Sequence, residues 1–121
     1  MTGACYYAPQ YIVQRSSDDG LPDLGRFANP AVLILSSLAD GDKHGYALTQ
    51  DIQTFADVTL GPGTLYGALA RLEQHGLIQA LPAEERRRPY RLTPAGAAAL
   101  TAYLQHARTV TTVGLRRLAG A

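Results

Sequence analysis

The chain has 121 residues, of which 46% are hydrophobic and 17% charged, and its formal net charge is +1. These values are typical of one soluble globular domain and exclude a disordered chain. The longest apolar run, residues 31–35, is too short to span a membrane. One cysteine, Cys5, excludes an intrachain disulfide, and the scattered histidines predict neither a metal nor a cofactor.

The charges are unevenly divided along the chain. Residues 1–70 carry three basic and seven acidic side chains, whereas residues 71–121 carry eight basic and three acidic ones, so the balance shifts from −4 to +5. This shift indicates an anion-binding surface in the second half of the chain, although an uneven solvated surface would give the same counts.

The N-terminal segment, residues 1–29, begins with an apolar-aromatic stretch that includes Tyr7 and Tyr11. Such a patch is costly to leave in water, so we expect the segment to be ordered and these tyrosines to pack on the last helix in a dimer interface. The alternative is that they line a pocket for a small aromatic effector. No basic region followed by an apolar run marks a secretory signal, and we expect a cytoplasmic protein.

Two helices are predicted in the next part of the chain. Asn29 and Pro30 cap and open a nearly all-apolar helix over residues 31–39, which we expect at the centre of the core. A second, amphipathic helix is predicted over residues 44–56. Its buried side is expected to contain four side chains: Tyr46, Leu48, Ile52 and Phe55.

A third helix is predicted between Pro62 and Gly76, with Thr64 as its cap and Gly76 in a left-handed C-terminal turn. Its core stripe is Leu65, Ala68, Leu69 and Leu72. The opposite stripe is slim and polar, and it consists of Tyr66, Gly67, Ala70, Arg71 and Gln74. A slim face without acidic charge fits the major groove of DNA.

A β-hairpin follows, with strands over residues 77–81 and 90–93 around a polar tip. The tip carries Glu84 and Glu85 and then three arginines in a row, which suit phosphates or a narrow minor groove. Three helices followed by a hairpin are the order of a winged helix-turn-helix. We therefore predict a mainly α fold with a small β-hairpin, of the α+β class.

The last helix is predicted from Thr93-Pro94 to the C-terminus. Its seam residues are spaced alternately four and three apart, with Tyr103 and Val110 beside them: Leu100, Leu104, Ala107, Thr111, Gly114 and Leu118. Such a seam predicts a homodimer held by residues 94–121, and its small residues would also admit a flat ligand. The alternative is packing within one subunit.

Three segments of the chain form a set with a defined order and spacing: HGYALTQDI at 44–52, GTLYGALARLEQHGLI at 63–78 and RPYRLTPAG at 88–96. In these segments the chain resembles the PadR-like family of transcriptional regulators. The resemblance implies a dimeric DNA-binding repressor with a winged helix over residues 30–93 and a C-terminal dimerisation helix. It also implies release by small molecules such as phenolic acids. The wing tip departs from the family, whose tips are often rich in glycine and carry lysine.

The candidate site residues follow from these elements. The expected contacts with double-stranded DNA, in an operator expected to be pseudo-palindromic, are Lys43, His44, Thr64, Tyr66, Gly67, Arg71, Arg86, Arg87 and Arg88. Three of them have structural alternatives: an ion pair for Arg71, support of the wing for Tyr66 and a bond within the turn for His44. The absence of any clustered nucleophile and base speaks against an enzyme. A winged-helix module that binds protein instead of DNA is the alternative function.

Overall fold

The computed structural model describes residues 29–120, so the predictions for Tyr7, Tyr11 and the rest of residues 1–28 lie outside the described residues. The elements in chain order are α1 (Pro30–Leu38), β1 (Lys43–His44), α2 (Gly45–Ala56), α3 (Pro62–Gln74), β2 (Ile78–Ala80), β3 (Pro89–Leu92) and α4 (Pro94–Gly120). The predicted mainly α fold with a small β-hairpin is confirmed, and the short strand β1 is an addition that the sequence analysis did not predict.

The helix ends show which local signals decide the boundaries. Asn29 caps α1 as predicted, because its side chain accepts hydrogen bonds from the two amides at Ala31 and Val32. Gly76 follows α3 with φ of 73°, the left-handed turn expected of it. The predicted cap at Thr64 is wrong. The cap is Gly61, because Pro62 lacks an N–H and already has the helical φ, which starts α3 earlier.

The core forms around α1, which packs against α2, α3, β3 and α4. The stripe predicted for α3 is buried there, with exposed fractions of at most 5%. Two predictions for α2 are wrong, since Tyr46 and Phe55 are 65% and 50% exposed. Tyr46 comes two positions before Leu48 and so lies on the opposite side of α2, and Phe55 lies in its last turn. The side that faces α1 is filled by Leu48 and Ile52.

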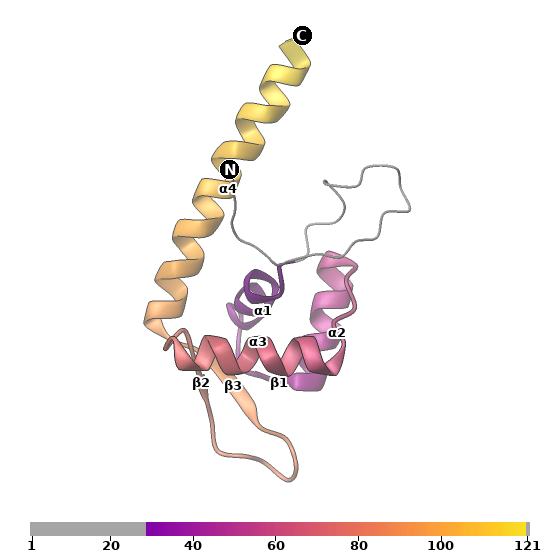
Figure 1. Cartoon of the computed structure of the whole chain (residues 1–121), viewed down its shortest axis with the longest axis vertical. Coiled ribbons are helices and arrows are strands. Elements are labelled where there is room, and N and C mark those ends of the chain that lie inside the picture. The colour runs from indigo at the N-terminus through magenta and orange to yellow at the C-terminus, as the bar shows by residue number, and fades with distance from the viewer. Residues whose placement is uncertain (1–28, 121) are drawn as a thin grey trace.

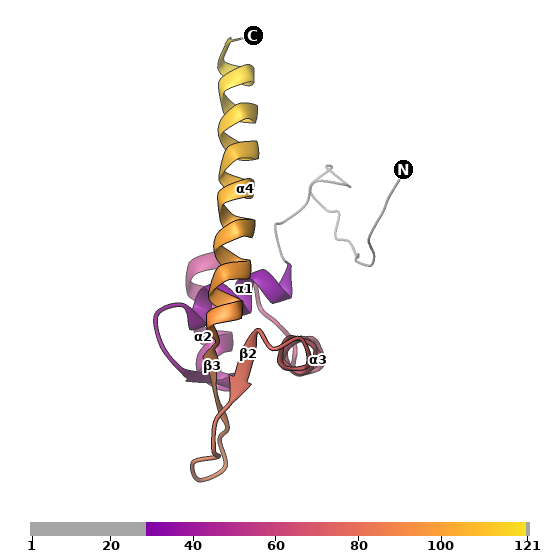
Figure 2. The ribbon, with the colours of Figure 1, turned by 90° about the vertical axis from the view of Figure 1, so that its left-hand side faces the viewer.

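The three strands form one antiparallel sheet in the order β1-β3-β2. Ile78 pairs with Leu92 and Ala80 with Tyr90, while Lys43 pairs with Tyr90 on the other edge. Figure 2 shows the hairpin of β2 and β3, which we call the wing (residues 78–92), extending beyond the helices. Because β1 precedes α2 directly, its pairing with β3 ties the wing to the start of α2.

Helix α4 begins on the sheet and then leaves the domain. The amide of Gly96 donates a 3.0 Å hydrogen bond to Oγ1 of Thr93, which confirms the predicted start. A β-carbon at Gly96 would overlap the carbonyl oxygen of Leu77 and lie 2.8 Å from Cδ1 of Leu92, so the first turn lies directly on β2 and β3.

Leu100 is 6% exposed and belongs to the core of its own subunit, so the structure places it off the predicted dimer seam. From there α4 extends away from the other elements (Figure 1). Within residues 29–120, no helix combines the length and hydropathy that crossing a bilayer would require.

Candidate nucleic-acid interface

The predicted recognition face of α3 is open in the structure. Tyr66 is 53% exposed, and Thr64 and Arg71 are exposed as well. Gly67 is half-buried, and a β-carbon there would lie 3.6 Å from Nη1 of Arg71, so the guanidinium leans over the glycine. The face therefore has a phenol at one end, a guanidinium at the centre and little bulk between them.

Tyr66 also contacts α2. The ring rests on Gly45, the first residue of α2, where a β-carbon would overlap the hydroxyl oxygen and lie 3.0 Å from Cζ. Only glycine leaves room for the hydroxyl at this position, so the ring of Tyr66 packs directly against the backbone of α2. Gly45 is a site residue that the sequence analysis missed, and its place in the HGY sequence gave no signal for this contact.

The wing tip is a tight turn. Glu84 and Arg87 exchange two backbone hydrogen bonds of 2.7 and 2.8 Å around Glu85 and Arg86. Glu85 has φ of 57°, a conformation that favours glycine. The three predicted arginines differ in their partners. Nη1 of Arg88 donates to the carbonyl of Leu81 at 2.8 Å, Arg87 reaches His44, and Arg86 is exposed at the tip.

Lys43 is turned inward and is not brought together with the arginines. Its ammonium donates to the carbonyl of Ser37 and to the carboxylate of Asp40, and it lies 4.0 Å from that of Asp51. The hydrogen bond and charge of Lys43 lower the pKa of Asp40. The lysine thus fastens β1 to the end of α1, and its predicted contact with DNA would require it to leave these partners.

His44 joins the wing to α2. Its Nδ1 accepts from the amide of Ala47 at 3.4 Å and so caps α2, which is the structural alternative considered for it. Its Nε2 lies 3.2 Å from Nη1 of Arg87. The same residue is therefore both the cap of a helix and the neighbour of a wing arginine.

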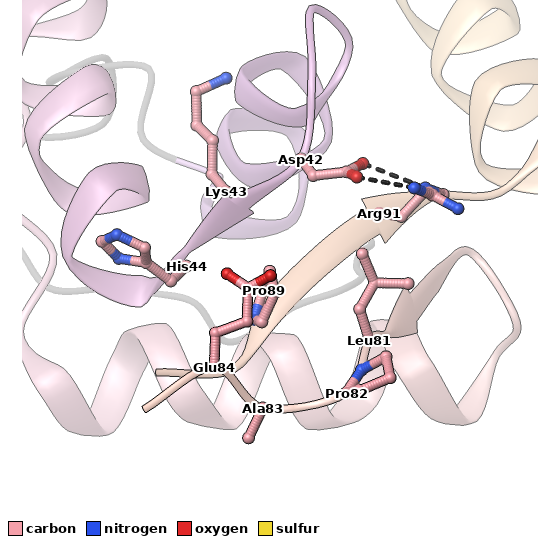
Figure 3. Close-up of a pocket in the computed structure, with 9 residues that line it drawn as sticks. All are labelled: Asp42, Lys43, His44, Leu81, Pro82, Ala83, Glu84, Pro89 and Arg91. Atoms are coloured by element: carbon pink, nitrogen blue, oxygen red, sulfur yellow. Dashed lines mark hydrogen bonds and ion pairs between the residues drawn. The ribbon is translucent and has the colours of Figure 1, made fainter. Parts of the chain in front are cut away.

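An ion pair joins Asp42, the residue before β1, to Arg91 of β3. Nε and Nη2 of Arg91 donate to the two carboxylate oxygens of Asp42 at 3.1 and 2.8 Å. The hydrogen bond from Arg91 lowers the pKa of Asp42, and Asp42 in turn raises the pKa of Arg91. This pair lines a hollow of about 570 Å³ between β1 and the wing, and His44 and Glu84 are also among its lining residues. Figure 3 shows these residues.

This pair, too, is missing from the sequence-based set. In the sequence, Arg91 is one of the eight basic residues in the second half of the chain, and no spacing pattern connects it with Asp42. The residues 29–120 contain no group of three or more histidine or acidic side chains that could hold a metal ion. The described residues offer exposed hydrogen-bond donors on α3 and the wing.

An exposed third helix, a short sheet and a projecting hairpin define a winged helix-turn-helix protein. Residues 34–102 match the model of the transcriptional regulator PadR-like family, and this match covers more than half of the chain. The chain belongs to the PadR-like family of transcriptional regulators.

Individual relatives agree with this assignment. The transcriptional regulator Rv3488 of Mycobacterium tuberculosis is 46% identical over 71 residues, which are 56% of this chain and 65% of that protein. An uncharacterised 37.1 kDa protein of a Streptomyces fradiae transposon is 52% identical over 65 residues, 54% of this chain and 19% of that protein. The chain thus spans less than two thirds of the length of these two relatives.

A solved structure extends the similarity to three dimensions. The PadR family transcription regulator of Clostridium difficile has a TM-score of 0.67 and 30% identity, with 74% of this chain and 97% of that chain covered.

Proposed function

We propose that this protein binds double-stranded DNA in a sequence-specific manner as a homodimer and represses transcription. The observation that carries the proposal is the arrangement of α3 and the wing. Both lie at the end of the molecule opposite the free end of α4, as Figures 1 and 2 show together. A duplex laid along that end would meet the phenol and guanidinium of α3 and the arginines of the wing at once.

The two parts of this surface have different tasks. The slim face around Gly67 admits α3 to the major groove, where Arg71 can donate to a guanine edge and Tyr66 to a phosphate. Arg86 and Arg87 at the wing tip contact the backbone, and they supply affinity that does not depend on sequence.

Dimerisation is proposed through α4. Past Leu100 the helix carries a row of exposed large apolar side chains, namely Tyr103, Leu104, Val110, Leu115 and Leu118. The exposed fraction rises to 77% at Leu118, and a second copy of the helix would cover this stripe. A two-fold dimer implies a pseudo-palindromic operator. A small aromatic effector and the packing of Tyr7 and Tyr11 on α4 belong to the same proposal, as does action in the cytoplasm, where such an operator would lie.

A binding assay over a salt series, with footprints on the DNA upstream of the protein's own gene, tests the proposal. For a DNA-binding protein, the logarithm of the affinity falls linearly with the logarithm of the salt concentration. Arg71→Ala should cost about 1–3 kcal/mol on the preferred sequence and relax specificity there. Arg86→Ala and Arg87→Ala should instead weaken binding to all sequences alike and flatten the salt dependence. A protein without salt-dependent affinity for any duplex would be the protein-binding module of the alternative.

A further inference from the structure

The ring of His44 faces a hydrogen-bond donor at each of its two nitrogens. The amide of Ala47 lies 3.4 Å from Nδ1, and Nη1 of Arg87 lies 3.2 Å from Nε2. Backbone amides and guanidinium groups only donate hydrogen bonds at these nitrogens. Each contact therefore requires a ring nitrogen of His44 to accept a hydrogen bond.

A neutral imidazole has one accepting nitrogen, because the other carries the proton. His44 can cap α2 or hold Arg87, but it cannot do both in the same state. When it caps α2, its Nε2–H points at a guanidinium N–H. When it is protonated, it has two donors and can accept from neither neighbour. The wing contact and the α2 cap are thus alternatives that depend on where the protons of one ring lie.

Charged groups from several elements lie around the ring. Arg87 of the wing contacts the ring directly, and the ring caps the N-terminus of α2. Glu84 of the wing, Asp42 before β1, Lys43 of β1 and Arg91 of β3 line the same hollow as His44. Two of the three cations have carboxylate partners, Arg91 with Asp42 and Lys43 with Asp40. Arg87 and the positive end of the α2 dipole lie directly beside the imidazole.

We propose that His44 takes up a proton from solvent when the wing binds DNA and then donates from Nε2 to a backbone phosphate. This inference rests on the proposed function. A DNA phosphate would attract the guanidinium of Arg87 away from the ring, so that it no longer repels a protonated imidazole. A phosphate oxygen would then accept the hydrogen bond from Nε2. Histidine is the side chain that ordinarily changes charge near neutral pH. DNA binding is therefore linked to pH through a residue between the wing and α2.

The test is the affinity of the full chain for a mixed-sequence duplex of about 30 base pairs, long enough for two half-sites. It is measured at pH 6 and pH 8 at constant ionic strength. The wild-type protein should bind about fivefold more tightly at pH 6, the factor that an exposed charged pair worth about 1 kcal/mol supplies. His44→Asn should lose this difference, since asparagine caps helices well but does not titrate. Melting curves of the variant establish that it is folded.

His75→Gln and His106→Gln are the matched controls, because they remove the chain's other histidines without touching His44. Both should keep the wild-type pH dependence. A second measurement counts the protons directly, by calorimetric titration at pH 7 in two buffers of different ionisation enthalpy. Net proton uptake on binding by the wild type, and none by His44→Asn, is the expected result.

Two outcomes would overturn the inference while leaving the proposed function intact. One is equal wild-type affinity at both pH values, and the other is a His44→Asn variant with the full wild-type pH dependence. Failure of the proposed function looks different, because the wild-type protein would then show no salt-dependent binding to any duplex at either pH, and both proposals would fall.

Discussion

The hydroxyl of Tyr66 rests on the backbone of Gly45, so the orientation of an exposed aromatic ring on α3 is set by a missing side chain on α2. Gly45 is buried, whereas the ring of Tyr66 is half-exposed. A methyl group at position 45 would push the phenol outward, and the phenol can yield because only its far end is in the way. The contact thus controls the recognition face more than it controls the core.

Gly45→Ala should therefore weaken specific DNA binding by about 1 kcal/mol while changing the stability by less than about 1 kcal/mol, since alanine also favours the helix. The measurements are binding isotherms and thermal melts. Gly45→Ala in a Tyr66→Ala background isolates the pair. If Gly45→Ala lowered the affinity equally in that background, the glycine would not act through Tyr66.

Substitutions of Glu85 at the wing tip should raise the affinity for DNA, and one of them should also raise the stability. Its positive φ favours glycine, and its carboxylate lies beside arginines proposed to meet phosphates. Glu85→Gly and Glu85→Gln should both raise DNA affinity, because both remove a negative charge. Only Glu85→Gly should also relieve the backbone, and it should be the more stable of the two by about 0.5–1 kcal/mol. Salt-series binding and melting curves separate the two effects. A Glu85→Gln variant at least as stable as Glu85→Gly would argue against backbone strain at the turn.

Low pH should remove the contribution of the Asp42–Arg91 ion pair to the stability of the folded protein. The folded-state pKa of Asp42 is lowered from its ordinary 3.8, so the pair stabilises the protein above that value and loses its effect as the pH falls through the folded pKa. The melting temperature of the wild type should exceed that of Asp42→Asn near pH 6, and the difference should shrink as the pH falls below 3.8 and vanish below the folded-state pKa. In an Arg91→Gln background, Asp42→Asn should show no such pH-dependent difference. If the difference in melting temperature between wild type and Asp42→Asn persisted in acid, it would arise from packing and not from the ion pair.

The seam on α4 is tested by charge. Leu104→Asp places a carboxylate in the proposed interface, where it would be desolvated, and should give monomers or a partly unfolded chain. Ala102→Asp, on the opposite side of the same helix, should leave the assembly unchanged. Light scattering coupled to gel filtration measures the mass of each. A well-folded Leu104→Asp dimer of wild-type mass would refute the proposed seam.

The sequence predicted those features that depend on local rules. The cap at Asn29, the left-handed Gly76 and the buried stripe of α3 are properties of a few neighbouring residues, and the structure has them as expected. The exposed Tyr46 and Phe55 show the limit of periodicity, because a short helix needs only a narrow buried face.

Contacts between distant segments could not be predicted in this way. The pairing of Asp42 with Arg91 and the approach of Arg87 to His44 both depend on β1 lying beside β3. A two-residue strand has no hydrophobic period to reveal it. The site residues that were missed, Gly45 and Arg91, belong to this group, since their roles arise only from their neighbours across the fold.

The tight contact of Gly96 with Leu77 and Leu92 has a mechanical consequence for the proposed dimer. A helix of 27 residues is about 40 Å long, and its first turn is seated on the sheet without room for a side chain. We therefore expect α4 and the winged domain to move together as one rigid body. A small change in the angle at which two such helices cross becomes a displacement of ångströms between the two recognition helices. In the proposed dimer, the spacing of the DNA half-sites would therefore be set by how the two α4 helices pack together.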